Sequence, residues 1–150
     1  MNVIHHHRTP KALWWILAAG FTLRFFHSDA PLLGTNSWRM CDNGMIARNF
    51  AVRDMNPLHP RVDWAGGTPG IVQMEFPAYQ YSVALLYKLF GVRDWLGRWV
   101  SILCSMASLW MLFQLGRRIS DVRSALWGTF FFAILPLNVY YGRALMVEAA

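Results

Sequence analysis

The sequence predicts an all-α fold: a polytopic membrane helical bundle with an outer loop that carries juxtamembrane helices. Of its 150 residues, 55% are hydrophobic and only 15% are charged, whereas a soluble domain carries about a quarter charged residues. Uncharged runs close to membrane-spanning length recur along the chain. The formal net charge of +6 comes from basic residues that flank these runs, which favours membrane insertion over nucleic-acid binding.

The chain begins with a basic tail, residues 1–11, which precedes a predicted transmembrane helix over residues 12–28. Arg24 interrupts the apolar run of this helix, and near a helix end an arginine can snorkel to the interface. No small-residue cleavage site follows, and Phe25 and Phe26 suit an interfacial anchor, so a cleaved signal peptide is disfavoured. The three histidines at 5–7 lack cysteine or acidic neighbours, which favours a basic tail over a metal site.

An outer loop is predicted over residues 29–94, with a first juxtamembrane helix at 37–52. Asn36 or Ser37 would cap this helix, and Asp42, Ile46 and Asn49 would share one of its faces. A turn-rich segment punctuated by proline and glycine follows. Loops of this length in compact proteins are usually functional.

A second juxtamembrane helix is predicted at 77–90. The uncharged stretch between Glu75 and Lys88 makes only about 18 Å of helix, too short to cross a bilayer alone. A helix lying in the interface is therefore favoured over a short span that its neighbours extend. The helical spacing predicts one apolar face, formed by Tyr79, Val83, Leu86 and Phe90. A second, less apolar face is formed by Gln80, Ala84 and Lys88.

Two further transmembrane helices are predicted at 95–115 and 124–142, joined by a basic cytoplasmic turn at 116–123. Pro136 is expected to kink the second of them. Residues 143–150 would start a second outer loop. Because the tail and the turn are the most basic short loops, both should face the cytoplasm, which places Asp42, Glu75 and Glu148 together on the outer side.

Four segments together resemble the N-terminal part of a GT-C-class membrane glycosyltransferase. They are WRMCDNGMIARNF, HPRVDWAGGTPGIVQMEFPAYQYSVALLYKLFG, GRWVSILCSMASLWMLFQLGRR and ALWGTFFFAILPLNVYYGRALMVEA. The branch is the one that is protein O-mannosyltransferase-like and aminoarabinose-transferase-like (glycosyltransferase family 39 type). The matching elements are Asp42, Glu75 with Pro77, Phe90-Gly91, Arg117-Arg118, and Arg143 with Glu148.

The resemblance implies transfer of a hexosyl or pentosyl group from a polyprenyl-phosphate-linked donor to an acceptor hydroxyl on the outer face of the cell (inner) membrane. Asp42 would be the catalytic base. Glu75 and Glu148 would position hydroxyls, and Arg143 and Arg39 would face the donor phosphate. The acceptor is unknown: a protein, a lipid or a polysaccharide. No cofactor is implied with certainty, although a divalent metal ion suits some relatives.

Each candidate residue also has a structural interpretation. Asp42 can pair with Arg39 one turn back and be solvated, and Glu75 can favour a helix dipole. Arg143 and Glu148 can anchor a span end or pair with each other. For Asp63 and Trp64, a structural turn is favoured over a sugar-stacking wall.

Two interpretations of the whole chain remain open. The alternative to an enzyme is a non-catalytic polytopic membrane protein, such as a transporter or assembly subunit, that uses the outer loop for protein contact. Because the resembling enzymes have many more spans, the sequence is interpreted as an N-terminal fragment and is expected to be inactive alone.

Overall fold

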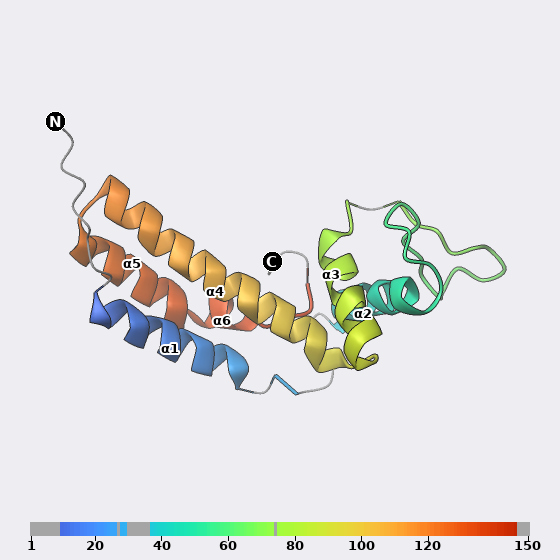
Figure 1. Ribbon diagram of the computed structural model, residues 1–150, viewed down its shortest axis with the longest axis horizontal. Coiled ribbons are helices and arrows are strands. Elements are labelled where there is room, and N and C mark those ends of the chain that lie inside the picture. The colour runs from blue at the N-terminus through green and yellow to red at the C-terminus, as the bar shows by residue number, and fades with distance from the viewer. Residues whose placement is uncertain (1–9, 27, 30–36, 74, 147–150) are drawn as a thin grey trace.

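The computed structural model describes residues 10–26, 28–29, 37–73 and 75–146, and within these residues every regular element is helical. One isolated antiparallel bridge, between Arg61 and Ile71, is the single β-type pairing in this part of the chain. The all-α prediction is therefore confirmed for the described residues. Figure 1 shows an elongated group of helices with a smaller pair of helices at one end.

The elongated part contains α1 (Lys11–Phe25), α4 (Asp94–Ile119) and α5 (Val122–Ile134), which run side by side. Leu13, Phe113 and Ala125 form their shared core. Of the described helices, α4 is the one that is long and apolar enough to cross a membrane, and α5 is a shorter apolar helix. Whether α1, α4 and α5 cross a membrane stays a prediction.

Much of the outer surface of these three helices is apolar. Only 28% of the most apolar stretch of α4 is buried, whereas a core helix of a soluble protein would be mostly buried. Large exposed side chains include Trp14, Trp15, Leu103, Met111, Trp127 and Phe131. An apolar exterior of this extent is typical of a surface that meets lipid or another protein.

The expected kink at Pro136 is confirmed, because α5 ends at Ile134 and α6 (Pro136–Tyr141) begins after Leu135. Proline has no backbone N–H, so the carbonyl of Phe132 loses its helical donor. The side chain of Asn138 donates to that carbonyl instead, at 3.3 Å. The predicted helix at 124–142 is thus two helices, and a hydrogen bond from the Asn138 side chain connects them across Leu135.

Arg24 is fully buried, with 0% of its surface exposed, so the expectation that it snorkels is wrong. Its guanidinium donates to the Ala133 carbonyl at 2.9 Å and to Ser105 Oγ at 2.8 Å. The break before Pro136 leaves the Ala133 carbonyl without its usual helical partner. Arg24 therefore remains inside because carbonyl and hydroxyl acceptors meet it there.

A short connection joins α4 to α5. Helix α4 continues to Ile119, beyond the start of the predicted turn at 116, and only Ser120 and Asp121 lie between the two helices. The Asp121 carboxylate caps α5 by accepting hydrogen bonds from the backbone N–H groups of Arg123 and Ser124. Hydrogen bonds from Ser124 lower the pKa of Asp121 to about 2.

The smaller pair consists of α2 (Ser37–Val52) and α3 (Ala78–Phe90), which pack together at the N-terminal end of α4. The predicted apolar face of α3 is only partly right. Gln80 is 1% exposed and Ala84 0%, whereas Phe90 is 62% exposed. The reason is that α3 has two neighbours: Tyr79, Val83 and Tyr87 pack toward α4, and Ala84 packs toward α2.

Candidate functional site

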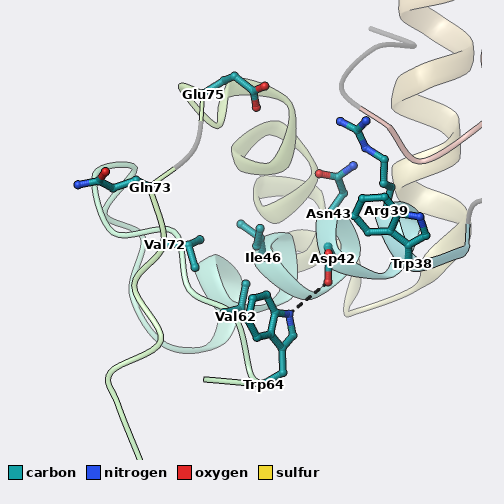
Figure 2. Close-up of a pocket in the computed structure, with 10 residues that line it drawn as sticks. All are labelled: Trp38, Arg39, Asp42, Asn43, Ile46, Val62, Trp64, Val72, Gln73 and Glu75. Carbon is teal, nitrogen blue, oxygen red and sulfur yellow. Dashed lines mark hydrogen bonds between the residues drawn. The ribbon is translucent and has the colours of Figure 1, made fainter. Parts of the chain in front are cut away.

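A hollow of about 350 Å³ lies between α2 and the segment that leads to α3. We refer to it as the α2 hollow. Its lining combines two indole rings, two carboxylates, one guanidinium, two amides and three aliphatic side chains: Trp38, Arg39, Asp42, Asn43, Ile46, Val62, Trp64, Val72, Gln73 and Glu75. Figure 2 shows these side chains around the space between them.

Asp42 lies on α2 and is half-buried in the wall of the α2 hollow. Its carboxylate accepts a hydrogen bond from the indole N–H of Trp64 at 3.4 Å, drawn as a dashed line in Figure 2. One turn further along α2, Ile46 is buried and packs against Val62 of the loop. A hydrophobic contact and an indole donor therefore hold the loop beside this carboxylate.

Trp64 reaches Asp42 because the preceding residue, Asp63, anchors the loop to α2. The Asp63 carboxylate accepts hydrogen bonds from Asn49 Nδ2 and from the Arg53 guanidinium, each at 3.0 Å. The predicted structural role is therefore right for Asp63. Trp64, by contrast, lines the hollow and is 69% exposed.

The loop turns tightly at Gly70, which has a φ of +71°. A Cβ atom at this position would lie 2.4 Å from the Val62 carbonyl oxygen. The backbone N–H of Val62 donates to the Gly70 carbonyl at 2.9 Å. Only glycine fits this conformation and approach without strain, and the turn fixes Val62 in the wall of the hollow.

Arg39 brings a positive charge to the α2 hollow. Its guanidinium lies 5.8 Å from the centre of the Trp38 ring, within the range of a cation–π interaction. Both side chains are exposed at one edge of the hollow. An anion bound in the hollow would therefore lie near the guanidinium of Arg39.

Glu75 supplies the second carboxylate from the other side of the α2 hollow. It precedes α3, which begins at Ala78 with Pro77 as its N-cap and has no acidic residue in its first turn. The structure thus brings Asp42, Arg39 and Glu75 to one hollow, although 33 positions separate Asp42 from Glu75 in the printed sequence.

Arg143 lies elsewhere, and Glu148 is outside the described residues. The Arg143 guanidinium donates to the backbone carbonyl of Phe26, so it joins the segment after α6 to the end of α1. It is not among the residues that line the α2 hollow. Its predicted contact with a donor phosphate stays a prediction.

A buried amide chain supports the hollow from behind. Gln80 Nε2 donates to Asn43 Oδ1 at 2.8 Å, and Asn43 Nδ2 donates to the Leu145 carbonyl at 3.2 Å. This chain links α3, α2 and the segment after α6. The sequence analysis did not predict this chain, and the available signal was a glutamine between two tyrosines in a mainly apolar helix.

The described residues contain no cluster of three or more histidine, cysteine or acidic side chains that could hold a metal ion. A family model described as dolichyl-phosphate-mannose-protein mannosyltransferase matches residues 74–150. The matched range contains Glu75, Arg143 and Glu148, whereas Arg39 and Asp42 precede it. No curated protein and no solved structure matches the chain.

Proposed function

The chain belongs to the dolichyl-phosphate-mannose-protein mannosyltransferase family, and from this premise we propose that it transfers a sugar from a polyprenyl-phosphate-linked donor to an acceptor hydroxyl. Membership agrees with the resemblance found in the sequence, and it indicates a membrane glycosyltransferase of the GT-C type. We further propose that transfer takes place at the outer face of the cell membrane, with Asp42 as the general base.

The observation that carries the proposal is the shared lining of the α2 hollow by Asp42, Arg39 and Glu75. In the reaction, the acceptor oxygen attacks the anomeric carbon of the sugar. The bond from that carbon to the phosphate oxygen breaks, and the lipid phosphate leaves with the electron pair. A carboxylate within hydrogen-bond reach of the acceptor hydroxyl takes its proton, which is the role of Asp42.

Arg39 would stabilise the negative charge that develops on the departing phosphate, because a charge-assisted hydrogen bond strengthens as that charge grows. Glu75, on the facing side, would accept hydrogen bonds from sugar or acceptor hydroxyls. Trp64 keeps Asp42 in place through its indole N–H and offers an exposed ring face to the same space. As the family resemblance implies, Arg143 would face the donor phosphate, and Glu148 would position hydroxyls of the donor or the acceptor.

The test is transfer of a radiolabelled sugar from a polyprenyl-phosphate donor, measured in membranes from cells that express the gene encoding this chain. Asp42→Asn keeps the size of the side chain and removes the base, so we expect transfer to fall about a hundredfold or more. The matched control is Asp54→Asn, because Asp54 lies in the segment that follows α2, pairs with His59 and Arg61, and does not line the hollow.

The control should keep the wild-type rate, and both variants should reach the membrane in equal amounts. Full transfer by Asp42→Asn at normal protein levels would exclude Asp42 as the base. If the wild-type membranes transfer no sugar from any polyprenyl-phosphate donor, the proposed reaction itself fails.

A further inference from the structure

Helices α1 and α5 both begin at the end of the molecule away from α2 and α3 (Figure 1). A second concave surface lies between the first turns of α1 and α5. We refer to it as the α1–α5 groove. Its volume is about 370 Å³, and its lining is apolar except for one guanidinium: Ala12, Ile16, Arg123, Leu126, Trp127 and Phe130. No step of the proposed transfer uses this surface.

Arg123 is the charged member of the groove. Its side chain is exposed, and within the described residues its guanidinium forms no ion pair and no hydrogen bond. The nearby carboxylate of Asp121 is engaged instead with the hydroxyl of Ser124, at 2.6 Å, and with the first backbone N–H groups of α5. A cation with no partner among the described residues thus lies beside the apolar groove.

Further basic residues gather at the same end. Lys11 begins α1 and is exposed, and Arg117 and Arg118 lie in the last turn of α4. Asp121 is the one acidic residue among those that start α1, end α4 and start α5. The end of the bundle around the groove is therefore strongly positive.

The tryptophans place this end at the depth of lipid headgroups. Trp14, Trp15 and Trp127 are exposed by 57%, 77% and 54%, and indole rings concentrate where hydrocarbon meets the polar layer of a bilayer. The groove continues from this level along Ile16, which follows Trp15 directly in α1, and Phe130, which lies about one turn beyond Trp127 in α5. Its polar end would meet headgroups and its apolar part would meet acyl chains.

We propose that the α1–α5 groove binds an anionic phospholipid, with the phosphate at Arg123 and an acyl chain along Ile16, Trp127 and Phe130. The apolar lining favours hydrocarbon, and the exposed guanidinium, which has no partner among the described residues, favours a negative charge; an anionic phospholipid carries both on one molecule. Basic residues at a membrane surface favour anionic lipids by an amount that corresponds to about a fivefold preference for each charge.

Trp127 provides the probe, because brominated acyl chains quench the fluorescence of a tryptophan in contact with them. The protein is placed in phosphatidylcholine bilayers that contain brominated phosphatidylglycerol or, separately, brominated phosphatidylcholine at the same mole fraction. The signal of Trp127 is the difference between wild type and Trp127→Phe. We expect brominated phosphatidylglycerol to reach half-maximal quenching of Trp127 at about one fifth of the mole fraction that brominated phosphatidylcholine needs.

Arg123→Gln should remove this preference and leave quenching by phosphatidylcholine unchanged, which also shows that the groove is intact. Arg118→Gln is the matched control, because Arg118 is exposed on the same basic end and does not line the groove; it should keep most of the preference. As a second measurement, native mass spectrometry should count fewer bound phosphatidylglycerol molecules on Arg123→Gln than on wild type.

Equal quenching by both lipids would reduce the groove to ordinary lipid contact and overturn the proposal. Protection of Trp127 from both lipids would show that a polypeptide segment covers the groove, which also overturns it. Neither result bears on the sugar transfer, because the variants lie outside the α2 hollow.

Discussion

Replacement of Arg24 by methionine should destabilise the helical bundle. Methionine leaves the Ala133 carbonyl without the donor that now lies 2.9 Å away, and an unsatisfied buried acceptor costs about 1–3 kcal/mol. The volume of the lost guanidinium stays unfilled in a side chain that is 0% exposed, which adds about 1 kcal/mol. We expect a loss of about 2–4 kcal/mol, or an apparent melting temperature lower by about 5–10 °C.

The measurement is thermal unfolding of the purified protein in detergent, followed by intrinsic fluorescence. Arg24→Lys keeps a cation that can donate to the Ala133 carbonyl but cannot reproduce the guanidinium fork, so its melting temperature should lie between those of wild type and Arg24→Met. Arg118→Met, an exposed arginine, should shift it by about 1 °C or less. A methionine variant that melts with wild type, or a lysine variant that melts below the methionine variant, would refute the reasoning.

Two further changes test neighbouring features of the structure. Gly142→Ala should lower the melting temperature through an overpacking cost of about 1–3 kcal/mol, because its Cβ would lie 2.6 Å from Ser105 Oγ and 2.7 Å from Arg24 Nε; Gly128→Ala, with no atom within 4 Å, should leave it unchanged or raise it. For Tyr87, burial and then the charge of Asp94 raise the pKa to about 12. The folded state therefore holds the phenol proton more tightly than the unfolded state, so this contribution to stability is complete below pH 10 and is lost as the pH rises to about 12. Tyr87→Phe should flatten the decline of melting temperature across that window, and an unchanged slope would contradict the assignment.

Local sequence patterns predicted helices well where capping or helix-breaking residues and the composition of the segment indicate the same boundaries. The predicted helix at 37–52 coincides with α2 (Ser37–Val52), and the break at Pro136 follows from the missing N–H of proline. The burial of Arg24 could not be predicted, because one of its acceptors is the Ala133 carbonyl, 109 positions away. The face of α3 was misjudged because helical periodicity cannot show that a helix has two neighbours.

The candidate site was predicted in its parts but not in its assembly. Asp42, Arg39 and Glu75 were each singled out, yet their convergence depends on how the loop is anchored by Asp63 to Asn49 and Arg53. Such contacts leave no periodic signal in a turn-rich segment. Trp38, Asn43 and Gln80 were not identified as site residues, because their roles come from packing between α2, α3 and the segment after α6.

The position of Arg24 constrains the order in which the nascent chain can assemble. Apart from the Gly20 carbonyl in its own helix, its acceptors belong to residues at least 81 positions later, so they are still unsynthesised when α1 leaves the ribosome. Arg24 lies in the last turn of α1, so its insertion costs less than the about 2.5–3.5 kcal/mol of an arginine at the centre of a membrane-spanning helix. The guanidinium can therefore be enclosed only after α4 and α5 have been synthesised, so the docking of α1 on these two helices is a late step of assembly.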